Sequence, residues 1–204
     1  MTLGVLMLAA VLFVQQPVES HAQSTDTYTV KSGDTLWKIS KRYHIGLSEI
    51  INANSQIKNP DLIYPGERVT IPLKKKVKSI EQQVIDLTNK ERTSRGIPAL
   101  KADWQLSRVA RYKARDMANK GYFSHTSPTY GSPFKMMKDF NISYHRAAEN
   151  IAAGQSTPEE VVNGWMNSAG HRRNILDRKL TRIGVGFAKG GSYGYYWSQM
   201  FISK

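Results

Sequence analysis

A short run of lysines divides this chain into two units of unequal size. The run lies within residues 73–79, directly after Pro72, and comprises Lys74, Lys75, Lys76 and Lys78. Like charges at this density repel one another and stay in water, so residues 73–79 are predicted to form a solvated linker. The preceding unit, 27–72, is small, whereas 80–204 is long enough for a medium-sized domain.

Composition limits what these units can do. The 204 residues include no cysteine, which excludes disulfides, thiol catalysis and cysteine-based zinc sites. Hydrophobic residues make up 40% of the chain and aromatic residues 10%, which is enough to build a core. The net charge of +13 predicts a polyanionic neighbour, such as nucleic acid, a membrane surface or an anionic wall polymer.

The N-terminal segment decides among these neighbours. Residues 3–14 are apolar but too few to cross a bilayer, which takes ~20 helical residues. Pro17 and Ser20-His21-Ala22 follow, which predicts a signal peptide over 1–22, with an uncleaved anchor or a buried helix as alternatives. No Lys or Arg precedes the apolar run, which leaves the true translation start open. Cleavage removes Glu19, so the mature charge is 29 − 15 = +14. We therefore expect a secreted protein of the cell wall or spore envelope, with anionic wall polymers as partners, no nucleic acid and no stable membrane span.

The first unit, 27–72, shows the pattern strand, helix, helix, strand. The predicted elements are a strand at 28–30, a helix from 36 that ends before Gly46, a helix at 47–54 and a strand at 68–71. Asp34 and Thr35 are both placed to cap the first helix. Trp37 and Tyr43 are expected to belong to the core.

Three separated blocks of this unit resemble the LysM family from end to end. They are Tyr28 to Ser40 (YTVKSGDTLWKIS), Asn52 to Asn54, and Ile63 to Pro72 (IYPGERVTIP). LysM domains bind glycans that contain N-acetylglucosamine, so the resemblance implies a peptidoglycan or chitin-type ligand.

The LysM resemblance also implies a shallow groove between two loops. The residues of the groove are Gly33, Asp34, Thr35 and Leu36 on one side and Asn59, Pro60, Asp61, Leu62 and Ile63 on the other. Backbone amides and Asp34 would hydrogen-bond the acetamido groups. The side chains of Leu36, Leu62 and Ile63 would lie against the apolar sugar face. A purely structural role for Asp34, as a helix cap, is the alternative.

The second unit, 80–204, mixes helical and strand patterns. The predicted elements are helices at 80–95, at 104–120 between Asp103 and Gly121, from Ser132-Pro133, and at 157–168 with a capping box, then strands at 182–189 and 195–202. Aromatic residues occupy both faces of the last strand, which favours a sheet covered by helices on each side. The predicted fold class is α+β.

Four motifs of this unit resemble the CAP (SCP-like) superfamily. They are Phe123 to Pro128 (FSHTSP), Ala148 to Ala152 (AENIA), Trp165 to Ile175 (WMNSAGHRRNI) and Ile183 to Gly186 (IGVG). The resemblance implies an α-β-α sandwich. The order of LysM before CAP is similar to that of sporulation or envelope proteins of Bacillus-like bacteria.

The CAP resemblance implies a cleft lined by two histidines and two acidic residues. His125, Glu149 and His171 match three of these positions, whereas Ser168 stands where the second Glu is expected. Two imidazoles and one carboxylate can hold a divalent metal such as Zn²⁺, so these three residues are candidate ligands. The missing carboxylate weakens that prediction, and histidines that only form hydrogen bonds are the alternative.

These features leave two main functions open, and a lipid or metal scavenger is a third, weaker option. In the first, LysM binds wall glycan and the CAP domain presents its cleft to an unidentified ligand. In the second, the chain is a cell-wall hydrolase or protease whose candidate catalytic residues are His125, Glu149, Ser168 and His171. No nucleophile elbow surrounds Ser168, so the sequence favours binding over catalysis.

Overall fold

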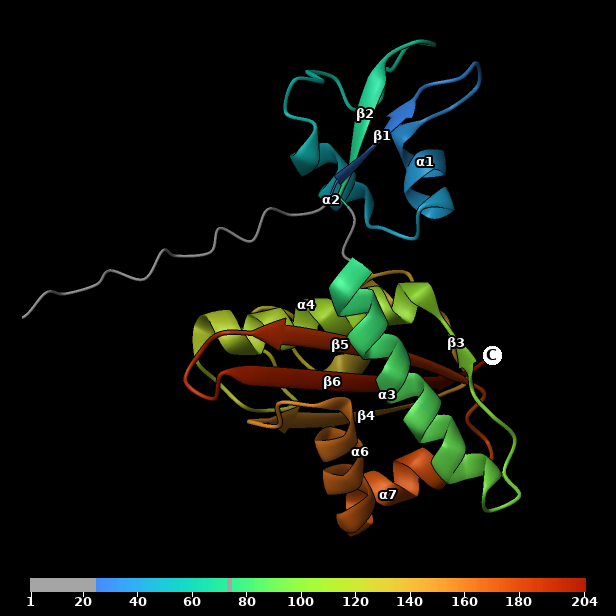
Figure 1. Ribbon diagram of the computed structural model, residues 1–204, viewed down its shortest axis with the longest axis vertical. Coiled ribbons are helices and arrows are strands. Elements are labelled where there is room, and N and C mark those ends of the chain that lie inside the picture. The colour runs from blue at the N-terminus through green and yellow to red at the C-terminus, as the bar shows by residue number, and fades with distance from the viewer. Residues whose placement is uncertain (1–24, 73–74) are drawn as a thin grey trace, which may run out of the picture.

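The computed structural model describes residues 25–72 and 75–204 (Figure 1). The predicted signal peptide, 1–22, and the first two residues of the predicted linker lie outside these ranges. The described residues form two α+β units, each with its own sheet and its own hydrophobic core. In the described ranges, no helix combines the length and apolar character needed to span a membrane.

The N-terminal unit packs two short helices on a two-stranded antiparallel sheet. Its elements are β1 (Thr25–Thr29), α1 (Leu36–Arg42), α2 (Leu47–Ala53) and β2 (Arg68–Pro72). This order confirms the predicted βααβ pattern. Asn54 ties α2 to β2, because its side-chain amide donates to the carbonyls of Ile50 and Thr70 and accepts from the Thr70 N–H.

One expectation for this unit is wrong. Trp37 was expected in the core, but 54% of it is exposed. Leu36, Ile39 and Ser40 form the buried face of α1, and the helical period of 3.6 residues turns Trp37 away from that face. Tyr43 is half-buried and packs against the core as expected.

The C-terminal unit contains a four-stranded sheet in the order β3-β5-β6-β4. Its strands are β3 (Lys101–Ala102), β4 (Arg146–Ala153), β5 (Arg182–Lys189) and β6 (Tyr195–Ser203). β3 is parallel to β5, and the other pairs are antiparallel. β4 therefore lies at one edge of the sheet.

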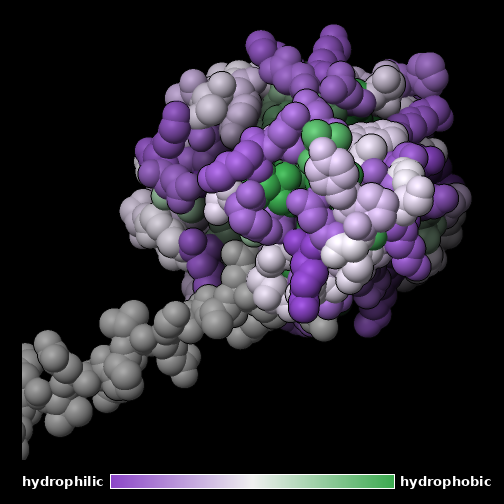
Figure 2. Space-filling view, turned by 90° about the horizontal axis from the view of Figure 1, so that it is seen from above, coloured by the Kyte–Doolittle hydropathy of each residue, from purple (hydrophilic) through white to green (hydrophobic). Residues whose placement is uncertain are grey.

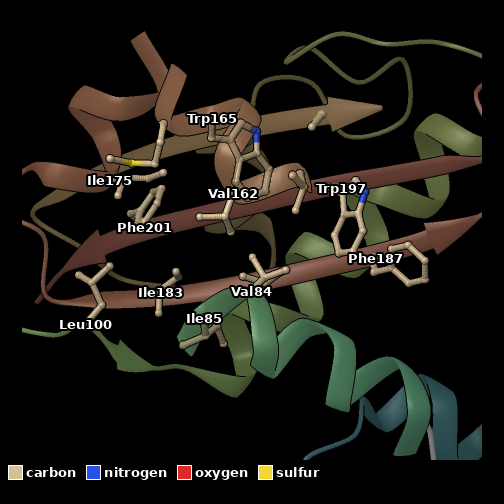
Figure 3. Packing of buried hydrophobic residues seen from close by; sticks show 14 of the residues in the cluster. Val84, Ile85, Leu100, Val162, Trp165, Ile175, Ile183, Phe187, Trp197 and Phe201 are labelled. Atoms are coloured by element: carbon tan, nitrogen blue, oxygen red, sulfur yellow. The ribbon is translucent and has the colours of Figure 1, made fainter. Parts of the chain in front are cut away.

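Helices cover both faces of this sheet. One face packs against α4 (Trp104–Lys120) and α5 (Pro133–Asp139), and the other packs against α3 (Lys75–Thr93), α6 (Pro158–Asn167) and α7 (Ala169–Leu176). Figure 3 shows Val84 of α3 and Trp165 of α6 gathered over Phe201 of β6. The predicted α-β-α sandwich is confirmed.

Strand β5 shows why helix α4 lies so close to the sheet. Ile183, Val185 and Phe187 point into the core under α3, α6 and α7. Gly184 and Gly186 alternate with them and face α4, and a Cβ on Gly186 would lie 2.0 Å from the carbonyl carbon of Ala110. The backbone of α4 therefore rests directly on β5, and any side chain at Gly186 would push it away.

The structure corrects the predicted linker and adds two elements that the sequence analysis did not assign. Residues 75–79 begin α3 instead of extending a linker, because lysine is a good helix former and the helix continues into an apolar stripe. The AENIA segment is the edge strand β4, and a separate helix, α7, follows α6. Ser168 is the residue between α6 and α7.

The two units contact each other through α2, the turn before it, and α4. The His44 ring stacks on Trp104 with centroids 5.5 Å apart. The hydroxyls of Ser48 and Tyr112 lie 3.0 Å apart. These contacts use the side of the N-terminal unit that faces α4 and leave its far end free of the C-terminal unit (Figure 1).

Candidate functional site

The predicted LysM groove lies at the far end of the N-terminal unit. Figure 1 shows the loop between β1 and α1 and the loop between α2 and β2 at the end farther from α4. Figure 2 looks onto this end and shows hydrophobic atoms near its centre, bordered by hydrophilic ones. The two loops are therefore accessible to a large ligand.

In the loop between β1 and α1, the polar side chains form hydrogen bonds within the LysM unit. The Asp34 carboxylate accepts hydrogen bonds from the Tyr28 hydroxyl at 2.6 Å and from the Lys31 N–H at 2.9 Å. The bond from Tyr28 is the main cause that lowers the pKa of Asp34. The Thr35 hydroxyl caps α1 by accepting from the Lys38 N–H. Asp34 and Thr35 therefore shape the loop.

Leu36 does not lie where the groove hypothesis expected its side chain. Only 1% of the residue is exposed, because it belongs to the core face of α1. An apolar contact between Leu36 and a sugar is therefore corrected to a packing role. Gly33, with φ of 79°, forms the turn that a side chain would strain.

The second loop presents the exposed apolar side chains. Leu62 is 50% exposed, Tyr64 is exposed, and Ile63 is half-buried. The side-chain oxygen of Asn59 accepts from the Asp61 N–H at 3.1 Å and fixes the approach to Leu62. The remaining predicted groove residues divide into exposed Asn59 and Asp61 and half-buried Pro60.

Sequence reasoning missed two residues of this end. Trp37 was assigned to the core, and Tyr64 was assigned only to a turn, yet both are large exposed hydrophobic residues. The nearest sequence signal for Tyr64 is the adjoining Pro65-Gly66 turn, because side chains in tight turns point into solvent.

The CAP motifs bring His125 and Glu149 together at the outer edge of β4. Nδ1 of His125 lies 2.8 Å from Oε1 of Glu149. The Glu149 side chain is almost wholly buried, and its other oxygen accepts from the Ser198 hydroxyl at 3.3 Å. When Nδ1 carries the proton, Glu149 fixes the ring and leaves Nε2 of the exposed His125 as an acceptor.

A buried lysine positions the loop that carries His125. Nζ of Lys113, on α4, donates to the carbonyls of Ser124 at 2.6 Å and His125 at 2.9 Å. Burial lowers the pKa of Lys113, and the negative charge of Glu149 opposes that shift. Sequence reasoning missed both Lys113 and Ser198, since neither lies in a CAP motif.

His171 lies on the other side of the cluster, on α7. Its carbonyl accepts from the Asn150 side chain at 3.2 Å. Asn150 also donates to Gln199 and accepts from Asn174, so buried amides lock α7 to β4. Burial is the main cause that lowers the pKa of His171, and the charge of His125 lowers it further.

The metal and triad hypotheses can be tested against this geometry. Within 25–72 and 75–204, no three His, Asp or Glu side chains are grouped closely enough to hold a metal ion. In this structure His125 and Glu149 form a hydrogen-bonded pair, and His171 does not complete a group of three with them. A carboxylate on Nδ1 of His125 is the orientation that a triad needs, and Ser168 precedes α7 without a side-chain cap bond.

Comparisons with known proteins agree with both units. The profile of the LysM domain matches residues 28–72, and that of the cysteine-rich secretory protein family (CAP) matches residues 85–201. The chain is 56% identical over 128 residues to the uncharacterized protein YkwD of Bacillus subtilis, an alignment that covers 63% of this chain and 49% of that protein. The LysM segment is 45% identical over 47 residues to the spore coat assembly protein ExsA of Bacillus cereus, which covers 23% of this chain and 7% of ExsA.

A solved structure has the same fold as the C-terminal unit. An extracellular protein with an SCP domain from Bacillus anthracis superposes with a TM-score of 0.58 at 38% identity, covering 69% of this chain and 47% of that one. The chain spans about half or less of the length of these relatives. Because the CAP profile covers more than half of the chain, this protein belongs to the CAP family and carries an N-terminal LysM domain.

Proposed function

We propose that this protein is a secreted envelope protein that binds N-acetylglucosamine-containing glycan, peptidoglycan in particular, through its LysM domain. The observation that carries the proposal is the exposure of Leu62 and Tyr64 on the loop between α2 and β2, together with exposed Trp37 at the start of α1. Large apolar side chains that are exposed close together often mark a ligand-binding surface. Sugar rings have apolar faces that suit such side chains, and the loop backbones supply hydrogen bonds for acetamido groups.

The charge of the chain adds a second, weaker attraction. The net charge is +13 over the full sequence, which attracts anionic wall polymers without a specific site. This attraction is screened by salt, since the Debye length is about 8 Å at physiological ionic strength and about 3 Å at 1 M. Glycan binding by apolar contact is not screened by salt. Binding measured over a series of salt concentrations therefore distinguishes glycan binding from the charge attraction.

Co-sedimentation of the mature chain with purified peptidoglycan tests the proposal. We expect binding that persists in 1 M salt and that drops about tenfold in a Leu62→Ala/Tyr64→Ala variant. Phe134→Ala is the matched control, since Phe134 is also exposed but lies on α5 of the CAP domain. Binding that disappears in salt, or that the double variant leaves intact, would overturn the assignment to LysM.

A second candidate function is hydrolysis of wall material in the CAP cleft. The observation in its favour is the His125–Glu149 pair, because a carboxylate that orients an imidazole is a common general-base arrangement. Incubation with peptidoglycan should then release soluble fragments in the wild type but not in His125→Ala. If the wild type releases no fragments from several wall types, this candidate is rejected and the CAP domain remains a binding module.

A further inference from the structure

Exposed aromatic side chains gather at a second place, far from the LysM loops. In the described ranges, the large exposed hydrophobic residues outside LysM are Phe123, Phe134 and Tyr193. Phe134 lies on α5, whereas Phe123 and Tyr193 come from two different loops and touch. Their ring centroids are 6.1 Å apart and the rings are tilted by 54°. We refer to these two residues as the aromatic platform.

The loop that carries Phe123 is held firmly from below. Tyr122 next to it points inward, and its hydroxyl donates to Asp116 at 2.7 Å. On the other side, Lys113 binds the carbonyls of Ser124 and His125. Because the chain is fixed on both sides, Phe123 is held toward solvent.

The loop that carries Tyr193 is equally constrained. The N–H of Gly190 donates to the Gly194 carbonyl at 2.9 Å, which closes the turn between β5 and β6. Gly191 has φ of 61°, and a Cβ there would lie 2.7 Å from the Ala118 carbonyl oxygen. The Tyr193 ring packs edge-on against buried Tyr196 at 5.8 Å. Figure 1 shows this loop and the C-terminal end of α4 at the same end of the sheet.

The two loops that carry the aromatic platform contain no charged residue themselves, although exposed Lys120 and Lys189 adjoin them in the sequence. Segments 121–127 and 190–196 contain no Lys, Arg, Asp or Glu, although the chain carries a net charge of +13. Their exposed polar groups are hydroxyls, including those of Ser124, Thr126 and Ser192. A polyanion is held by several cations at once, and the two loops themselves contribute none. Aromatic faces bordered by hydroxyls instead suit the apolar face and the hydroxyl rim of a neutral sugar ring.

We propose that the aromatic platform is a second glycan-binding subsite, which holds an uncharged pyranose unit beside the His125–Glu149 pair. Phe123 lies two residues before His125 in the same loop, so a sugar on the platform adjoins the CAP cleft. The inference rests on the proposed function, because glycan held by LysM raises the local concentration of sugar at the platform. A weak subsite is then sufficient to guide the strand across the CAP domain.

An NMR titration of the isotope-labelled mature chain with N-acetylglucosamine tetramer tests this proposal. We expect two separate sets of amide shifts, one in the LysM loops and one at 190–195 and 121–126. Phe123→Ala/Tyr193→Ala should weaken the second set about tenfold and leave the first unchanged. Leu62→Ala/Tyr64→Ala should do the opposite, and Phe134→Ala should change neither. A parallel titration with soluble peptidoglycan fragments should shift the same two sets.

The outcomes separate this inference from the proposed function. Shifts in LysM alone, up to millimolar ligand, would overturn the subsite and leave the LysM assignment standing. Shifts at the aromatic platform alone would overturn the LysM assignment and support the subsite. If neither set shifts with either ligand, both proposals are wrong. If Phe134→Ala weakens the second set as much as the platform variant does, the platform residues are not the contact and the subsite is rejected.

Discussion

The LysM loops and the CAP cleft use their charged groups in opposite ways. In LysM, the carboxylate of Asp34 is occupied by Tyr28 and Lys31, and the second loop exposes the apolar side chain of Leu62 beside polar Asn59 and Asp61. In the cleft, the buried carboxylate of Glu149 holds the exposed ring of His125. The LysM loops therefore offer a surface that suits the shape of a ligand. The His125–Glu149 pair offers an oriented imidazole for a ligand that is not yet identified.

This difference separates the contributions of the two domains. In the proposed function, the LysM loops retain the chain at a glycan mainly through apolar contact. In the CAP domain, Glu149 orients the His125 ring, and no group of three His, Asp or Glu side chains in the described residues is placed to hold a metal ion. Changes that destabilise one unit should therefore spare the other, and the following predictions test that separation.

The largest effect is expected at the contact between β5 and α4. Gly186→Ala would place a Cβ 2.0 Å from the backbone of α4, which should destabilise the CAP domain by about 3 kcal/mol or more. Gly164→Ala, on α6 with nothing within 4 Å, is the control and should be neutral or slightly stabilising. Unfolding followed by NMR signals of each unit should show that the LysM transition does not move. A parallel loss in LysM would mean that the units unfold together.

The next largest effect on stability distinguishes Leu36 from Leu62, which the sequence analysis placed in the same groove. Leu36→Ala removes a buried side chain and should destabilise LysM by about 3 kcal/mol. Leu62→Ala removes an exposed one and should change stability by less than about 0.5 kcal/mol, while weakening glycan binding. Chemical denaturation and peptidoglycan binding, measured on both variants, check this pair. Equal loss of stability would show that Leu62 is also a packing residue.

The smallest effects concern pH. The pKa of His171 is lowered in the folded state, so the unfolded chain takes up this proton first as the solution is acidified. The CAP domain should therefore lose stability as the pH falls below the ordinary histidine value of 6.5, toward the lowered pKa. His171→Gln should flatten this part of the profile. Thermal unfolding between pH 7.5 and 5 measures it, and an unchanged slope in the variant would contradict the assignment.

LysM should respond only to stronger acid. The pKa of Asp34 is lowered, mainly by the hydrogen bond from Tyr28, so its contribution is fully present above the ordinary value of 3.8. It is lost as the pH falls from there through the lowered pKa. Asp34→Asn should remove this dependence from the LysM transition. Should LysM instead lose stability between pH 6.5 and 5, the contrast with the CAP domain would fail.

The sequence predicted the parts of the fold that depend on neighbouring residues. Asp103 and Thr157 cap α4 and α6 as expected, because capping is decided within one turn. Strand β5 spans the predicted residues, since Gly190-Gly191 ends its alternating pattern. The pairing of His125 with Glu149 followed from the family motifs. These motifs could be recognised without the three-dimensional structure.

The remaining site residues depend on contacts between distant segments. Lys113 is buried under the His125 loop, and Ser198 reaches Glu149 across neighbouring strands. Neither residue has a local pattern that reveals such a role. The aromatic platform likewise arises only because the loops of Phe123 and Tyr193 meet at one end of the sheet.

The most direct test of this account compares affinities for purified peptidoglycan. Dissociation constants are measured for the mature wild type, for Leu62→Ala/Tyr64→Ala and for His125→Ala, all at high salt. We predict that the loop variant binds about tenfold more weakly and that His125→Ala stays within about twofold of the wild type. If His125→Ala lost the affinity and the loop variant kept it, the CAP cleft would be the anchor and the account would be wrong.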